Sequence, residues 1–168
     1  MVRNKKKQLL NLLPQDVKNQ INDSLKKFPV DKKKSALLDA LMFAQEGNNG
    51  YLTNDLIESV AHYLDQPVIA AYEIATFYSM YELNPVGKYH INICTNVSCM
   101  LNGADDIVKY LQKILNIGFN EITKDGKFSI KAVECLGACV NAPMLLVNKK
   151  YYEKLTYEKI DQLIKELK

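Results

Sequence analysis

The sequence predicts an α/β protein in which an N-terminal helical bundle, residues 1–83, precedes a small α/β domain, residues 84–168. In the first part, apolar residues recur every three to four positions, as on one face of a helix. In the second part they recur at every second position in several short runs, as in strands. The residues Asn-Pro-Val-Gly at 84–87 separate the two patterns. With 168 residues, 48% of them hydrophobic, the chain is long enough for one or two small cores.

Four helices are expected in the N-terminal part. The first covers 14–28, and the second covers 31–47 and ends at a glycine. Thr53 or Asn54 caps the third helix, and the fourth follows a proline over 67–77. Four aromatic side chains near the end of this part, Tyr72, Phe77, Tyr78 and Tyr81, are expected to pack into the bundle rather than to line a partner interface or an electron route.

The C-terminal part is expected to alternate strands and helices. Strands are predicted at 89–94, at 128–133 and at 144–147, and the first two lead directly into cysteines. A helix is predicted between the first two strands, through Ile107, Leu111 and Leu115. The last helix covers 157–167, with Thr156 as its N-cap.

Composition excludes several classes of protein. No run approaches about 18 consecutive apolar residues and no cleavable apolar leader is visible, so neither a membrane span nor secretion is expected. The net charge is +3, and its basic excess lies in the first 50 residues. No aromatic residue is interleaved with the lysines at 5–7 and 32–34, which favours a solvated or docking surface over nucleic-acid binding. Four cysteines are too few for a disulfide scaffold.

The four cysteines form two spaced pairs, Cys94-x4-Cys99 and Cys135-x3-Cys139. Four converging thiolates are the ligand set of an iron–sulfur cluster or of structural zinc. The chain has no Cys-x2-Cys knuckle, which is usual for structural zinc, so the spacing favours a 2Fe-2S cluster. Zinc, dithiol redox chemistry and unliganded core cysteines remain alternatives. A Rieske centre is rejected because neither of the two histidines is suitably placed beside a cysteine.

The two longest stretches without charged residues, 89–104 and 135–148, contain all four cysteines. A 2Fe-2S cluster with four thiolates has a formal charge of about −2 and becomes more negative on reduction. Nearby carboxylates would therefore oppose reduction. Backbone N–H groups at Gly137 and the helix start at 102–104 are further candidates to face such an anionic centre.

Five segments together resemble the thioredoxin-like 2Fe-2S subunit of bacterial respiratory complex I, known as its E subunit. They are residues 94–99 (CTNVSC), 134–139 (ECLGAC), 142–143 (AP), 75–80 (ATFYSM) and 50–52 (GYL). The resemblance extends from about residue 28 to residue 155. It implies a thioredoxin-like 2Fe-2S ferredoxin domain behind the helical bundle, with one cluster held by Cys94, Cys99, Cys135 and Cys139.

The resemblance also implies an electron-transfer role within an NADH-quinone oxidoreductase. The expected partners are the flavoprotein subunit that binds NADH and FMN and other subunits of the hydrophilic arm. The expected location is cytoplasmic, peripheral at the inner membrane through the complex. Related subunits occur in NAD-reducing hydrogenases and NAD-dependent formate dehydrogenases, which remain alternative hosts; a four-cysteine zinc interaction module is a further alternative. No catalytic residue is expected on this chain, because its sequence shows no nucleophile–base pair and no phosphate-binding glycine loop.

Overall fold

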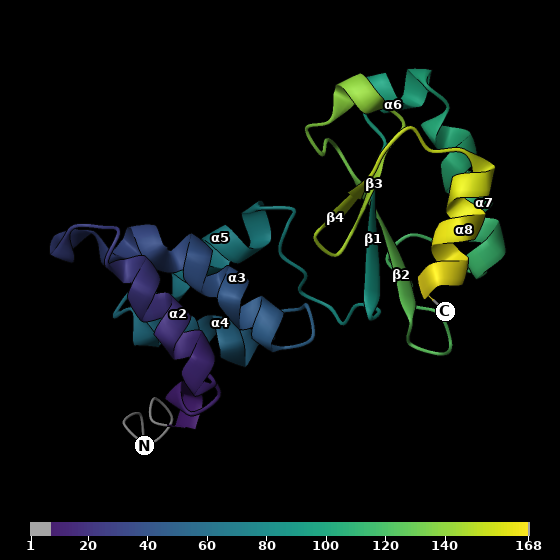
Figure 1. Ribbon diagram of the computed structural model, residues 1–168. Coiled ribbons are helices and arrows are strands. Elements are labelled where there is room, and N and C mark those ends of the chain that lie inside the picture. Colours follow the sequence, from purple (N-terminus) through teal and green to yellow (C-terminus); the bar gives the residue numbers. More distant parts are fainter. Residues whose placement is uncertain (1–7, 168) are drawn as a thin grey trace. The chain divides into compact units, whose positions relative to one another are not determined.

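The computed structural model describes residues 8–167 (Figure 1). Contacts divide the chain into two compact units, Met1–Pro85 and Val86–Lys168. That these units correspond to separate domains at 1–83 and 84–168 stays a prediction. No helix in the described part of the chain is long and apolar enough to cross a membrane.

The first unit is a bundle of helices. Its elements are α2 (Gln15–Leu25), the 3-10 helix η1 (Val30–Ala36), α3 (Leu37–Gly47), α4 (Asn54–Tyr63) and α5 (Val68–Phe77). The Thr53 hydroxyl accepts a hydrogen bond from the Leu56 amide at 3.2 Å, which confirms it as the cap of α4. Residues three or four positions apart face the core, as Val17 and Ile21 do on α2.

Two expectations for this unit were wrong. The second helix begins at Leu37 rather than near Asp31, because Lys32 has non-helical dihedral angles (φ −111°, ψ 32°) and the preceding residues form a 3-10 turn. The aromatic side chains are not all buried: Tyr81 is only 4% exposed, whereas Phe77, at the end of α5, is 80% exposed.

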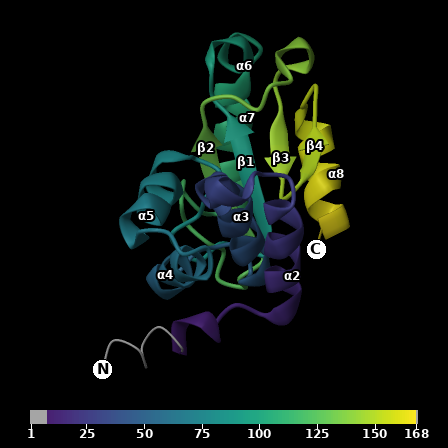
Figure 2. The same cartoon turned by 90° about the vertical axis from the view of Figure 1, so that its left-hand side faces the viewer.

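The second unit contains a four-stranded sheet in the order β2-β1-β3-β4 (Figure 2). Its strands are β1 (Tyr89–Cys94), β2 (Phe128–Val133), β3 (Leu145–Val147) and β4 (Lys150–Tyr152). β1 and β2 are parallel and in register from the pair Tyr89–Phe128 to the pair Cys94–Val133. β3 is antiparallel to β1, and β4 is antiparallel to β3.

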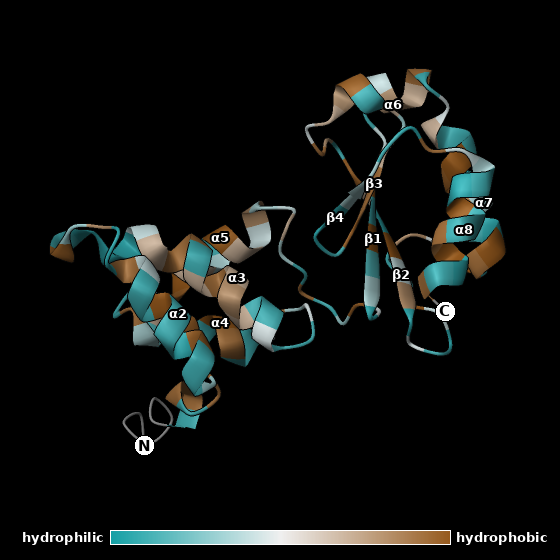
Figure 3. Ribbon diagram, viewed as in Figure 1, coloured by the Kyte–Doolittle hydropathy of each residue, from teal (hydrophilic) through white to brown (hydrophobic). Residues whose placement is uncertain are grey.

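Helices α7 (Ala104–Leu115) and α8 (Tyr157–Leu167) cover one face of this sheet (Figure 1). Both are amphipathic, with hydrophobic and hydrophilic residues mixed along each helix (Figure 3). The core between sheet and helices contains Ile91, Ile130, Leu111 and Ile160, none of which exposes any surface. The predicted strands and these two helices are confirmed.

Three short elements of this unit were not expected: α6 (Val97–Leu101), the 3-10 helix η2 (Cys139–Asn141) and β4. Asn96 caps α6, its side chain accepting from the Val97 amide at 2.7 Å. β4 forms a hairpin with β3, and Asn148 takes a positive φ of 52° in the connecting turn. Asparagine tolerates this left-handed conformation better than most residues.

Candidate metal centre

The four cysteines gather at one end of the sheet. Cys94 is the last residue of β1, and Cys135 follows the end of β2 by two residues. Because β1 and β2 are parallel and in register, the chain leaves both strands, toward Cys94 and Cys135, at the same end of the sheet. Cys99 lies within α6 and Cys139 is the first residue of η2; these two short helices lie together at that end (Figures 1 and 2).

Cys94 and Cys99 form the buried half of this group. Their exposed fractions are 2% and 1%, and they share a small core with Ala104 and Met144. Ala104 is the first residue of α7, so the start of that helix packs against the thiols as expected. Leu136, Ala138 and Ala142 pack around this core and limit the access of water to it.

Cys135 and Cys139 form the exposed half. Their Sγ atoms lie 4.0 Å apart, and the Gly137 amide donates a hydrogen bond to Cys135 Sγ at 3.3 Å. Gly137 has a φ of +79°, which favours glycine, and this conformation turns its N–H back toward the sulfur. The backbone donor that the sequence suggested at Gly137 is therefore present.

The two pairs interact with each other. Burial raises the pKa of Cys99 to about 11, and a hydrogen bond with the Cys94 side chain and the nearby Cys139 add to the shift. A buried thiol resists ionisation, whereas a coordinated metal ion deprotonates its thiol ligands. Without a bound metal ion, Cys99 is therefore a protonated thiol at neutral pH. It becomes a thiolate ligand when a metal ion binds.

The donor set fits a 2Fe-2S cluster. Two thiolates on one tetrahedral metal, with bonds of about 2.3 Å as for zinc, lie about 3.8 Å apart. The 4.0 Å between Cys135 and Cys139 is close to that separation. A two-iron cluster takes two thiolates on each iron, which matches two cysteine pairs. Within residues 8–167, no group of three or more His, Cys, Asp or Glu side chains is arranged to hold a single metal ion.

Two polar residues, one on β1 and one just after it, make hydrogen bonds to β2. The Thr95 hydroxyl donates to the Val133 carbonyl at 3.4 Å. The Nδ1 atom of His90 lies 2.8 Å from the Ser129 hydroxyl, near the end of β1 that is remote from Cys94. Each side chain thus has a local structural role in the α/β unit.

Exposed apolar side chains lie on the two short helices that carry Cys99 and Cys139. Val97, Met100 and Leu101 on α6 and Val140 on η2 are all exposed, from 45% at Met100 to 95% at Val140. We call these four residues the apolar rim. Hydrophobic residues are visible on α6 and η2 in Figure 3. Neither α6 nor η2 contains a charged residue, so the rim carries no charge of its own.

Sequence reasoning missed the residues that hold the loop of the exposed pair. Tyr151, on β4, donates its hydroxyl hydrogen to the Leu136 carbonyl at 3.2 Å. Glu153 accepts from the Asn141 side chain at 2.7 Å. These partners lie 15 and 12 positions apart in the sequence and belong to no periodic pattern. The asparagine in the turn between β3 and β4 is the one local signal that the chain turns back and brings Tyr151 and Glu153 toward the loop.

Comparison with known proteins identifies the family. The profile of the thioredoxin-like 2Fe-2S ferredoxins matches residues 21–168. The chain belongs to this family. Family membership confirms the predicted thioredoxin-like 2Fe-2S ferredoxin fold and implies one 2Fe-2S cluster. The assignment of the four cysteines as its ligands stays a prediction.

Family members similar to this chain include respiratory subunits. The E subunit of NADH-quinone oxidoreductase from Rickettsia felis is 51% identical over 148 residues, covering 88% of this chain and 89% of the relative. The mitochondrial NADH dehydrogenase [ubiquinone] flavoprotein 2 of Dictyostelium discoideum is 38% identical, covering 89% of this chain and 60% of that protein. The resemblance to the E subunit is thereby confirmed, as is the assignment to a multi-subunit oxidoreductase complex.

The fold is shared with a solved hydrogenase structure. A chain of an NAD+-reducing NiFe hydrogenase in the air-oxidised state superposes with a TM-score of 0.67 at 20% identity. The match covers 83% of this chain and 24% of the hydrogenase chain. At that identity the similarity supports the fold alone.

Proposed function

We propose that this chain is the electron-transfer subunit of a respiratory NADH-quinone oxidoreductase and holds one 2Fe-2S cluster on Cys94, Cys99, Cys135 and Cys139. The observation that carries the proposal is the convergence of these four thiols, as two pairs, at one end of the sheet. The 51% identity to an E subunit of such an enzyme, across most of both chains, supports the host complex.

The bound cluster supplies a centre that accepts and returns one electron. The protein's part is to set the conditions for that exchange. Cys94 and Cys99 anchor the site in an apolar core, which limits water around it. The Gly137 N–H bonds to Cys135 Sγ and stabilises negative charge on that sulfur. The charge-free segments contribute no carboxylate around a centre that becomes more negative on reduction, and the nearest carboxylates in the sequence, Asp105 and Glu134, lie at their ends.

The flavoprotein subunit that binds NADH and FMN is the proposed partner. The apolar rim supports this choice, because an uncharged apolar surface beside the thiols is suited to close contact with another protein. Such contact brings two redox centres near each other and excludes water between them. Other subunits of the hydrophilic arm complete the proposed assembly, which places the chain in the cytoplasm, peripheral at the inner membrane.

An NAD-reducing hydrogenase or an NAD-dependent formate dehydrogenase is the alternative host. In either enzyme the four cysteines would hold a 2Fe-2S cluster, so the site alone does not discriminate between the two hosts. Affinity purification of the tagged chain from its native cells separates them. Recovery of complex I subunits supports the proposal, and recovery of a hydrogenase or formate dehydrogenase subunit instead would replace it.

Metal analysis tests the cofactor assignment. The purified chain is expected to contain about two irons and two acid-labile sulfides and to give an electron paramagnetic resonance (EPR) signal only after reduction. One zinc per chain, with no iron, would instead establish the zinc interaction module.

A further inference from the structure

The loop that carries the exposed cysteine pair is fastened to a short segment that contains no cysteine. Residues 135–143 form this loop, and residues 151–155 form the segment, which we call the frame. Hydrogen bonds join them at three places along the loop: Tyr151 to Leu136, Glu153 and Lys154 to Asn141, and Leu155 to Pro143. The bonds therefore lie on both sides of Cys139 and directly after Cys135.

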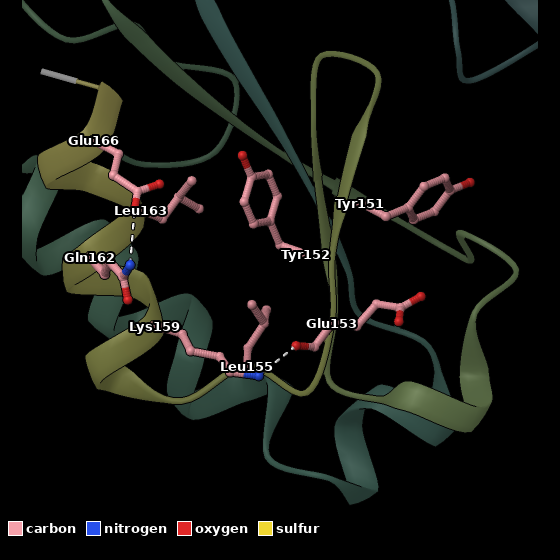
Figure 4. A pocket seen from close by; sticks show the side chains of 8 residues that line it. All are labelled: Tyr151, Tyr152, Glu153, Leu155, Lys159, Gln162, Leu163 and Glu166. Carbon is pink, nitrogen blue, oxygen red and sulfur yellow. Dashed lines mark hydrogen bonds between the residues drawn. The ribbon is translucent and has the colours of Figure 1, made fainter.

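The frame is itself fixed to the α/β core. Leu155 is 7% exposed and belongs to the hydrophobic core under α8. Lys159, on α8, donates from its Nζ to the carbonyls of Glu153 at 3.2 Å and Lys154 at 3.0 Å. Figure 4 shows Lys159 reaching toward the frame beside the cavity of about 300 Å³ between β4 and α8. The frame therefore connects the cysteine loop to the hydrophobic core of the α/β unit.

Tyr151 and its neighbour Tyr152 differ in their relation to that loop. Their side chains point to opposite sides of β4 (Figure 4), as successive residues of a strand do. The Tyr151 hydroxyl donates to the Leu136 carbonyl, next to Cys135. The Tyr152 hydroxyl has no hydrogen-bond partner among residues 8–167, and its ring lies 5.1 Å from the Lys150 Nζ.

We propose that Tyr151 and Glu153 are positioning residues that hold the Cys135–Cys139 pair at its metal-binding separation. Without such support, an exposed loop with a glycine between two cysteines has many conformations, and ordering it costs conformational entropy at each metal-binding event. Hydrogen bonds from outside the ligand set reduce that cost and slow the loss of the metal. This inference rests on the proposed function, because it assumes that the pair binds iron.

The first test compares Tyr151→Phe with Tyr152→Phe in the full cluster-loaded chain. Each variant loses one hydroxyl from β4, but only Tyr151→Phe frees the Leu136 carbonyl. We expect Tyr151→Phe to release iron to a strong chelator roughly two- to tenfold faster than wild type, the factor that one hydrogen bond of ordinary net strength represents. It should also shift the EPR spectrum of the reduced protein. Tyr152→Phe should match wild type in both measurements.

The second test uses Glu153 and contains its own rescue. Glu153→Ala removes the acceptor of the Asn141 side chain, whereas Glu153→Gln keeps a carbonyl oxygen in its place. Faster iron release from the alanine variant, with recovery in the glutamine variant, supports positioning by this hydrogen bond. Equal release rates for wild type, Glu153→Ala and Tyr151→Phe would overturn the inference.

Failure of the positioning role is distinguishable from failure of the proposed function. A wild-type chain that binds no iron overturns the proposed function. A wild-type chain that binds a 2Fe-2S cluster, but loses it no more slowly than the variants do, overturns only the positioning role.

Discussion

The sulfur atoms of Cys135 and Cys139 lie 4.0 Å apart on an exposed loop, close to the separation of two thiolates on one metal. Cys94 and Cys99 are buried beside them. The site therefore combines an anchored, apolar half with a half that reaches the surface. Substitutions in the two halves are expected to have different effects.

Replacing a buried and an exposed ligand should damage the cluster to different extents. Cys99→Ser places a hydroxyl in an apolar core at a position that is 1% exposed, so we expect loss of the cluster together with lower stability of the α/β unit. Cys135→Ser changes an exposed position, so we expect a lost or altered EPR signal with little change in stability when both proteins are compared without the cluster. Iron content, EPR and thermal unfolding measure these effects. Unaltered spectra in both variants would remove both residues from the ligand set.

Glycine substitution tests the backbone donor to Cys135. Gly137→Ala places a side chain at a φ of +79°, with no atom within 4 Å of the new Cβ, so its expected cost is conformational, about 1–2 kcal/mol. The Gly137 N–H is then expected to move away from Cys135 Sγ, which should speed iron release.

Gly126→Ala is the matched control for that variant. Gly126 has a φ of +71°, its new Cβ would also meet no atom within 4 Å, and it lies in the turn before β2. Unfolding measurements should show a similar loss of stability for both variants, and iron release should change only for Gly137→Ala. Equal iron release from the two would show that the N–H bond to sulfur has no effect.

Gln45 fixes the segment that follows α5 in the helical unit. Its side chain donates to the Met80 carbonyl at 3.1 Å and accepts from the Glu82 amide at 2.7 Å. Gln45→Ala leaves both backbone groups without this partner, so the free energy of unfolding should fall by about 1–3 kcal/mol. Gln15→Ala, at an exposed position on α2, should change it by less than about 0.5 kcal/mol. Chemical denaturation followed by circular dichroism compares them; equal stability of the two variants contradicts the assignment.

Tyr81 predicts a loss of stability at alkaline pH. Burial raises the pKa of Tyr81 to about 12, with contributions from the Asp39 charge and from Tyr78. In the unfolded chain the group ionises near its ordinary pKa of 10.0, so the unfolded state loses its proton first. The stabilisation is complete below pH 10 and is lost as the pH rises toward 12. Unfolding measurements across that range test it.

Tyr81→Phe should weaken that alkaline dependence. At neutral pH the same variant removes a hydrogen bond to the Leu38 carbonyl, at 2.8 Å, and should cost about 1 kcal/mol. A variant with the pH dependence of wild type would show that Tyr81 is not the group responsible.

The sequence predicted the elements whose signals are local. The caps Thr53 and Pro67, the strand alternation before Cys94 and the amphipathic stripe of α7 each lie within a few neighbouring residues. The second helix begins at Leu37, later than expected, because the helix propensities of the residues around Lys32 do not determine its dihedral angles. β4 was missed because three residues are too few to show a period.

The same distinction separates the cysteines from their support. Spacing, residue type and the absence of charge marked the four thiols in the sequence, because each of these signals lies beside a cysteine. The bond from Tyr151 to the Leu136 carbonyl depends on how β4 pairs with β3, a long-range relationship that no local pattern encodes.

The most direct test of the proposed cluster is the iron and acid-labile sulfide content of the anaerobically purified chain, measured together with its EPR spectrum before and after reduction. We predict about two irons and two sulfides per chain, and a signal that appears only on reduction. A colourless chain that contains zinc, or no metal, would contradict the proposal.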